Sequence, residues 1–128
     1  PGSINHHIGV FYDMMPTFTE LTGQQNTWTQ RTDGISMLPT LTGEGTQAEH
    51  DFLYWEFHEE NGRQAVRQGP WKLLRQNIKN SPSLELYNLD EDLYETTNLI
   101  TKYPEKAQEL VQKMDGARTP STLFNFGK

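Results

Sequence analysis

The sequence has 128 residues, a net charge of −6 and no cysteine, which is enough chain for one domain with a modest core. The lack of cysteine excludes a disulfide framework, a thiolate metal site and a thiol nucleophile. The excess of 17 acidic over 11 basic residues argues against a nucleic-acid partner, because such binding needs cations that neutralise phosphates. No membrane partner is expected, since no apolar stretch approaches the roughly 20 residues of a membrane span.

The first predicted helix covers residues 11 to 23, within a loop-rich segment formed by residues 1 to 50. Asp13 is a suitable N-cap, Pro16 is tolerated in the first turn, and Gly23 suits the left-handed residue after the last turn. Helical spacing also predicts one apolar face, made of Met14, Phe18 and Leu21.

A second, shorter helix is predicted after a surface loop of residues 23 to 34. Ser36 serves as its cap, Pro39 lies in its first turn and Gly43 ends it. The side chains expected to face inward are Leu38 and Leu41.

Residues 51 to 128 have the pattern of a strand meander followed by a helix. Residues 52 to 59 alternate with period 2, which predicts a strand with one buried face made of Leu53, Trp55 and Phe57. Asn61-Gly62 then predicts a two-residue hairpin turn with both residues at positive φ. Further strands are predicted over residues 63 to 67, 71 to 75 and 84 to 89.

The last predicted helix runs from residue 103 to residue 117 and should cover the apolar face of the sheet. Its apolar stripe consists of Ala107, Leu110, Val111 and Met114. The tail carries Leu123, Phe124 and Phe126, which we expect to fold back onto the body. The predicted fold class is α+β: a small antiparallel sheet of about four strands with a C-terminal helix packed on it, preceded by a loop-rich segment with short helices.

No metal site is expected in this sequence. The acidic residues between 88 and 98 do not place a glycine and a glutamate where a calcium-binding EF-hand loop needs them, so they predict an Asx-turn loop instead. His6 and His7 are adjacent, and neighbouring side chains on an extended chain point in opposite directions.

One polar group of residues is a candidate binding site at the end of the predicted hairpin. It consists of His58, Glu59, Arg63, Gln64 and Arg67. A histidine, a carboxylate and two guanidinium groups can hold an anionic or sugar-like ligand. The alternative is an ordinary solvated hairpin with cross-strand charge pairs.

Several strings resemble, in order, the C-terminal region of bacterial arylsulfatases of the formylglycine class, in the alkaline-phosphatase-like superfamily. The main ones are residues 52–59 and residues 64–72, with Glu85-Leu86-Tyr87-Asn88-Leu89 followed by Glu95 and Asn98-Leu99. Supporting strings are residues 1–3, 13–17, 33–39 and 118–121. The resemblance extends over nearly the whole sequence.

The resemblance implies that the whole protein is a sulfuric ester hydrolase acting on sulfate esters, with sulfated glycans as one substrate class. In that family a catalytic domain holds calcium and the formylglycine made from a Cys/Ser-x-Pro-x-Arg motif, which this sequence lacks. The 128 residues are therefore expected to contain no cofactor, no metal ligand and no catalytic residue, and to be inactive alone. The expected partner is the chain's own catalytic domain, on which residues 1–50 would pack, while residues 51–128 form the C-terminal subdomain.

Two alternatives stay open at the level of the sequence. The chain could be a stand-alone module that binds a carbohydrate or peptide through the hairpin, or a purely structural subdomain. Residues 1–50 could instead be stabilised by homo-oligomerisation or a domain swap. A protein that follows the family would be periplasmic or secreted.

Overall fold

The computed structural model describes residues 2, 4–24 and 32–126. The chain forms two compact units, Pro1–His50 and Asp51–Lys128. Most of the loop expected over residues 23 to 34 lies outside the described residues, as do Pro1 and Ser3 of the resemblance. The roles predicted for the two parts of the chain stay predictions. Within the described ranges, no helix has the length and apolar character needed to cross a membrane.

The first unit contains a 3-10 turn, η1 (Phe11–Asp13), and two short helices, α1 (Met14–Leu21) and α2 (Leu38–Thr42). Both helices were predicted, and α2 ends as expected at Gly43, which is left-handed with a φ of 76°. The Gly43 N–H donates to the Pro39 carbonyl at 2.9 Å. Ser36 Oγ accepts a hydrogen bond from the Leu38 N–H at 3.2 Å, but the N-cap position predicted for Ser36 is occupied by Met37, which makes no side-chain capping bond.

The predicted apolar faces of α1 and α2 are confirmed only in part: Met14 and Leu38 are half-buried, whereas Phe18, Leu21 and Leu41 are exposed. The buried residue of α1 is Thr17. Its hydroxyl donates to the Asp13 carbonyl at 2.6 Å and accepts from the Met37 N–H at 2.9 Å. Hydrogen bonds therefore decide which side of α1 faces inward, and its apolar side chains remain at the surface.

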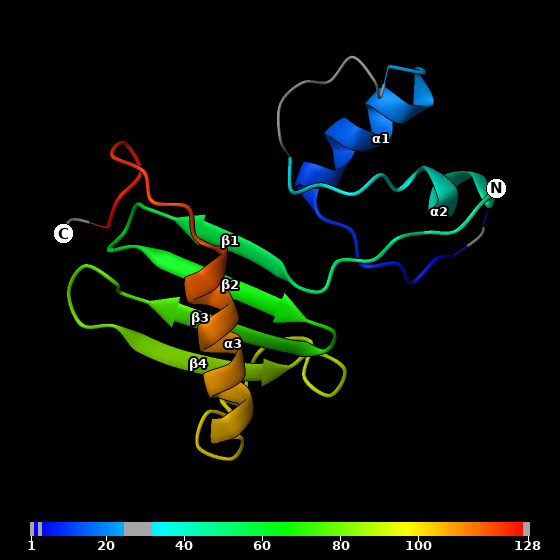
Figure 1. Cartoon of the computed structure of the whole chain (residues 1–128). Helices are drawn as coiled ribbons and strands as arrows, with labels where there is room; N and C mark the ends of the chain where they lie inside the picture. Colours follow the sequence, from blue (N-terminus) through cyan, green and yellow to red (C-terminus); the bar gives the residue numbers. More distant parts are fainter. Residues whose placement is uncertain (1, 3, 25–31, 127–128) are drawn as a thin grey trace. The chain divides into compact units, whose positions relative to one another are not determined.

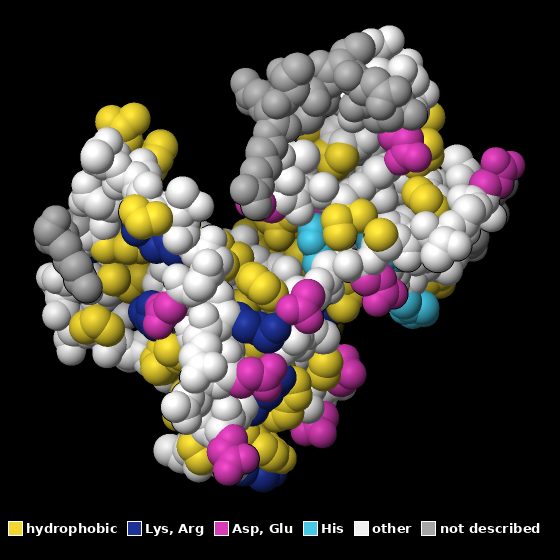
Figure 2. All heavy atoms as spheres, viewed as in Figure 1, with side chains coloured by type: hydrophobic (Ala, Val, Ile, Leu, Met, Phe, Trp, Pro, Cys, Tyr) yellow, Lys and Arg dark blue, Asp and Glu magenta, His cyan; other side chains and the backbone are white. Residues whose placement is uncertain are grey.

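The second unit is a four-stranded antiparallel sheet with one helix, α3 (Pro104–Ala117), lying across one face (Figure 1). The strands follow chain order across the sheet: β1 (Leu53–Phe57), β2 (Arg63–Gln68), β3 (Trp71–Gln76) and β4 (Ser83–Asn88). The predicted α+β class is confirmed. Acidic and basic side chains are interspersed around α3 (Figure 2). Lys106 pairs with Glu109 on the same helix, and Lys113 pairs with Asp51.

The core lies between α3 and one row of side chains that crosses the sheet. The pairing register places Tyr54, Val66, Leu73 and Leu86 side by side on β1 to β4. The last three are fully buried, and α3 covers them with Ala107, Leu110 and Met114. This confirms the stripe predicted for the helix, and each fully buried aliphatic side chain contributes about 1.5–3 kcal/mol of transfer free energy.

The buried face predicted for β1 is confirmed only at Leu53, which is 4% exposed. Trp55 and Phe57 are 38% and 47% exposed, because they lie on the face of the sheet opposite α3, whereas Tyr54 packs against the core. Alternate residues of a strand lie on the same face of the sheet. Tyr54 is paired with Val66, which α3 covers, so the Tyr54 side of β1 faces the helix.

The loop between β1 and β2 is also longer than the predicted two-residue turn. It spans residues 58–62, between the end of β1 and the start of β2. Three successive residues are left-handed, with φ of 47° at Glu60, 72° at Asn61 and 79° at Gly62. The Asn-Gly signal thus located the turn correctly and underestimated its length.

The acidic loop after β4 forms the predicted Asx turn, in which Asn88 Oδ1 accepts from the Asp90 N–H at 3.2 Å. The loop then returns to the outer edge of β4. Asn98 Oδ1 accepts from the N–H groups of Leu86 and Ile100, each at 3.0 Å, and the Leu99 N–H donates to the Leu86 carbonyl at 2.7 Å. The loop therefore supplies hydrogen-bond partners for backbone groups on the outer edge of β4, as a fifth strand would.

Candidate functional site

The five residues predicted to form a site do not converge on one point. Arg63 and Arg67 lie on the sheet face opposite α3, four residues apart on β2, which separates their Cα atoms by about 13 Å. Gln64 faces α3 and is buried. His58 and Glu59 lie in the hairpin loop. Their role in binding a ligand stays a prediction.

Arg63 and Arg67 are both engaged locally. Arg63 forms an ion pair with Glu60 in the loop, and its guanidinium lies 5.6 Å from the ring centroid of Phe57. Arg67 Nε donates to the Gly69 carbonyl at 3.0 Å. No hydrogen bond of the Arg67 terminal amino groups is found among the described residues, so these groups can bind an anion.

Gln64 belongs to a polar network that the sequence analysis did not anticipate. Its Nε2 donates to the Tyr54 hydroxyl at 2.7 Å, and its Oε1 accepts from Arg75 at 3.0 Å. Arg75 also donates to Asp115 near the end of α3, at 2.7 Å. This network pins the C-terminal turn of the helix onto the sheet, so Gln64 has a structural role.

Glu56 is the centre of the same network. One of its oxygens accepts from the Tyr54 hydroxyl at 2.7 Å and from Arg118 at 3.1 Å, and the other lies 3.1 Å from His58 Nε2. Burial raises the pKa of Glu56, but the hydrogen bonds from Tyr54 and His58 and the charge of Arg118 outweigh it and lower the pKa. Burial, together with the Glu56 carboxylate, raises the pKa of Tyr54.

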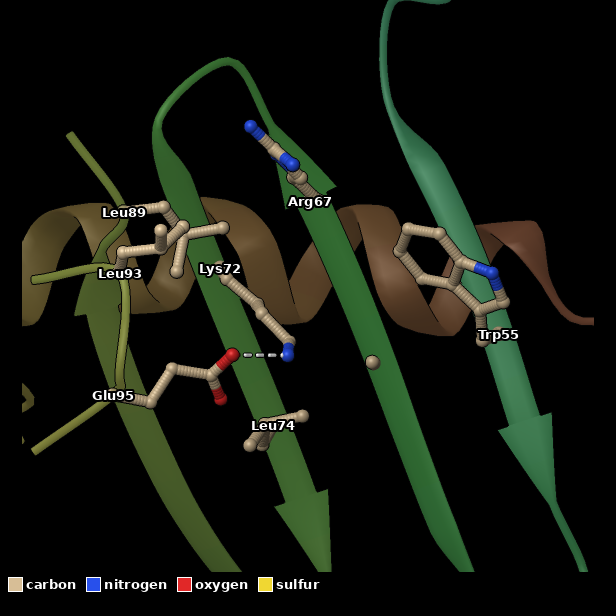
Figure 3. Close-up of a pocket in the computed structure, with 8 residues that line it drawn as sticks. Trp55, Arg67, Lys72, Leu74, Leu89, Leu93 and Glu95 are labelled. Carbon is tan, nitrogen blue, oxygen red and sulfur yellow. Dashed lines mark hydrogen bonds and ion pairs between the residues drawn. The ribbon is translucent and has the colours of Figure 1, made fainter. Parts of the chain in front are cut away.

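The sheet face opposite α3 contains an open hollow of about 410 Å³. Figure 3 shows it between Trp55 on β1 and the loop after β4, with α3 behind the sheet. The lining residues are Trp55, Ala65, Arg67, Lys72, Leu74, Leu89, Leu93 and Glu95. An indole ring, several leucines and an available guanidinium suit contact with a sugar ring or an apolar protein surface.

Lys72 and Glu95 form an ion pair at one side of this hollow, with Nζ and Oε1 2.5 Å apart (Figure 3). Glu95 has a positive φ of 56°, so the backbone turns sharply where the carboxylate meets β3. Both side chains are largely shielded from solvent. The Glu-x-x-Asn-Leu string therefore has two structural roles here, since Glu95 anchors the loop over the sheet and Asn98 closes the strand edge.

The first unit is organised around a buried carboxylate, Asp13. Its oxygens accept from the N–H groups of Val10 and Ile35, each at 2.9 Å, and lie 2.8 Å from His50 Nε2. The prediction that Asp13 caps α1 is wrong, because its side chain makes no capping bond to that helix. It holds the preceding 3-10 turn and two distant segments instead.

The formylglycine and calcium that the resemblance implies need a Cys/Ser-x-Pro-x-Arg motif and a cluster of oxygen ligands. The sequence contains no cysteine and no Ser-x-Pro-x-Arg string. Among residues 2, 4–24 and 32–126, no three histidine, aspartate or glutamate side chains are grouped as metal ligands. These residues therefore do not fit a formylglycine–calcium centre.

No protein-family model matches the sequence. Among solved structures, a protein from Bacteroides thetaiotaomicron assigned to the sulfatases matches with a TM-score of 0.70 and 29% identity. The match covers 81% of this chain and 23% of that chain. The chain matches a subregion of a sulfatase. It spans less than a quarter of the length of that protein.

Two further matches share the fold of this subregion. BT4656, solved with its substrate D-glucosamine-2-N,6-O-disulfate, matches with a TM-score of 0.65 and 23% identity over 82% of this chain and 23% of its own. The phosphonate monoester hydrolase of Agrobacterium radiobacter matches with a TM-score of 0.57 and 19% identity over 79% of this chain and 23% of its own. The fold of this subregion thus also occurs in a protein named as a phosphonate monoester hydrolase.

Proposed function

We propose that this chain is the C-terminal subregion of a sulfatase, and that the whole protein hydrolyses sulfate esters on sulfated sugars. The match to the Bacteroides thetaiotaomicron protein carries the proposal, because it extends over 81% of this chain at 29% identity. The sugar substrate is supported by BT4656, whose own substrate is a disulfated glucosamine.

The chemistry of the described residues is consistent with a supporting role for this subregion. Most of the described lysines and arginines are paired with carboxylates, as in Lys72–Glu95, Arg75–Asp115 and Arg118–Glu56. Exposed apolar side chains such as Phe18, Leu21 and Trp55 suit packing against further protein. In this proposal the nucleophile and the metal ligands come from the catalytic domain, and this subregion supplies a scaffold beside it.

A second candidate function is a binding module, which the hollow opposite α3 favours. Trp55 and the terminal amino groups of Arg67 line this hollow, and together they could hold a sugar that carries an anionic group. Binding of sulfated glycans by the 128-residue chain alone would support the module. Activity of the whole protein without such binding would support the scaffold.

The decisive experiment uses the protein encoded by the whole reading frame that contains this sequence. It should be assayed for sulfate release from sulfated glucosamines, and for phenyl phosphonate hydrolysis as the competing activity. We expect sulfate release by the whole protein and none by the 128-residue chain. A reading frame without a Cys/Ser-x-Pro-x-Arg motif, or a preference for the phosphonate, would refute the proposal.

A further inference from the structure

The C-terminal tail folds back onto the loop between β1 and β2 through Phe126, as predicted, whereas Leu123 and Phe124 are largely exposed. The ring of Phe126 stacks on the imidazole of His58, with centroids 4.4 Å apart and planes inclined by 16°. The guanidinium of Arg118 lies 5.2 Å from the Phe126 centroid. A Cβ atom at Gly62 would lie 2.6 Å from the Phe126 ring, so the glycine leaves the space that this ring needs. Phe126 therefore occupies a fitted niche.

Two backbone carbonyls of the tail also face side-chain donors. Arg118 Nη2, just after α3, donates to the Phe124 carbonyl at 2.7 Å. His58 Nδ1 lies 3.3 Å from the Asn125 carbonyl. The hairpin and the end of α3 thus each hold one peptide group of the tail.

Both ring nitrogens of His58 face groups that can only accept. Nδ1 faces the Asn125 carbonyl, and Nε2 lies 3.1 Å from Oε1 of Glu56. Glu56 is ionised at neutral pH, since its three donors keep its pKa below the ordinary value. A neutral imidazole has one N–H, so the two contacts become hydrogen bonds together only when the ring is an imidazolium.

We propose that the tail is a proton-coupled latch, which closes on the hairpin when His58 is protonated and loosens when His58 loses its proton. Deprotonation removes one of the two donors, and either the tail or Glu56 then loses its hydrogen bond. In this proposal the closed tail accepts a hydrogen bond that the protonated ring can always donate, so low pH favours closure and rising pH favours opening.

Charged groups of both signs surround His58. The Glu56 carboxylate on β1 contacts the imidazole directly, and Glu59 lies in the same loop as His58. Arg118, at the end of α3, donates to Glu56, and Lys79 Nζ donates to the His58 carbonyl at 2.7 Å. Glu60 in the loop is paired with Arg63.

The latch has a consequence for the ligand site predicted at the hairpin. Phe126 covers a face of the imidazole, and the tail and Glu56 engage both of its nitrogens. A ligand that uses His58 must therefore displace the tail, and it competes best at the higher pH, where the latch is weaker.

Nuclear magnetic resonance of the ¹⁵N-labelled 128-residue chain tests the latch between pH 5 and pH 8, the range in which histidine side chains titrate. We expect both ring nitrogens of His58 to carry protons at the low end, together with rigid amides over residues 122–126. The closed-to-open ratio should fall as pH rises, by at most about tenfold per pH unit, because one proton is coupled.

Two variants separate stacking from protonation. His58→Phe keeps an aromatic ring and removes both donors, so the order of the tail should become independent of pH. Phe126→Ala should loosen the tail at every pH, and the control His7→Gln should behave like the unchanged chain. A rigid tail beside a neutral His58 with one N–H, or a tail whose order does not change with pH, would overturn the proposal; both are read from the unchanged chain.

Discussion

Replacing Asn98 with alanine tests how the outer edge of the sheet is closed. Asn98 Oδ1 accepts hydrogen bonds from the N–H groups of Leu86 and Ile100, each at 3.0 Å. Leu86 is fully buried, so the variant leaves its N–H without a partner at a site that water reaches poorly. An unsatisfied buried donor costs about 1–3 kcal/mol, and we expect a loss of about 2 kcal/mol in the free energy of unfolding.

Amide hydrogen exchange at Leu86 is the direct measurement. A loss of about 2 kcal/mol corresponds to exchange roughly 30-fold faster at this amide. Asn98→Asp is the matched control, because it keeps an oxygen acceptor at the same place and should retain most of the protection. If the Leu86 amide exchanges at the same rate in Asn98→Ala, the loop does not close the edge in the way described.

Three further changes test the core, the polar network and the first unit. Leu110→Ala removes a fully buried side chain and should lower the free energy of unfolding in urea by about 3–5 kcal/mol. Glu56→Gln should cost about 2 kcal/mol at pH 7. The pKa of Glu56 is lowered on folding. The stability that its carboxylate contributes is therefore present above the ordinary pKa of 4.5 and is lost as pH falls below that value. Glu56→Gln should make the stability depend less on pH in this acid range. Asp13→Ala leaves three partly buried groups without their partner and should cost about 3–5 kcal/mol, seen as lost exchange protection at Ile35.

Each of these changes has a milder partner. Leu110→Met conserves volume and should cost less than about 1.5 kcal/mol. Glu59→Gln is the control for Glu56→Gln, because it alters an exposed carboxylate in the loop after β1. It should leave the loss of stability at acid pH unchanged. Asp13→Asn keeps one acceptor oxygen and should lie between alanine and the unchanged chain. If the two variants at Leu110, or the two at Asp13, lose equal stability, the role given to that side chain is wrong. If Glu56→Gln does not flatten the loss of stability at acid pH, the role given to Glu56 is wrong.

The strands and helices of residues 51–128 were predictable because their signals act over a few residues. Alternation along β1, the Asn61-Gly62 turn and the helical stripe of α3 each operate within about one element. The short helices of the first unit were found for the same reason, through Ser36, Pro39 and Gly43.

The choice of buried face was different. Both sides of β1 carry large apolar or aromatic groups, so alternation could not tell whether Tyr54 or Trp55 would face α3. The register decided it, because Tyr54 lies beside Val66 and Trp55 lies beside Ala65. In the first unit the hydrogen bonds of Thr17 outweighed the apolar pattern of α1.

The sequence by itself determined the order of the elements, the fold class and the resemblance to a region of sulfatases. The tertiary structure decided which polar groups meet. Gln64 donates to Tyr54, ten residues away, Asp13 meets His50 across 37 residues, and His58 meets Asn125 across 67. Local patterns report the geometry of a few neighbouring residues, whereas hydrogen-bond partners are set by the packing of distant segments, and one chain without an alignment carries no signal for that packing.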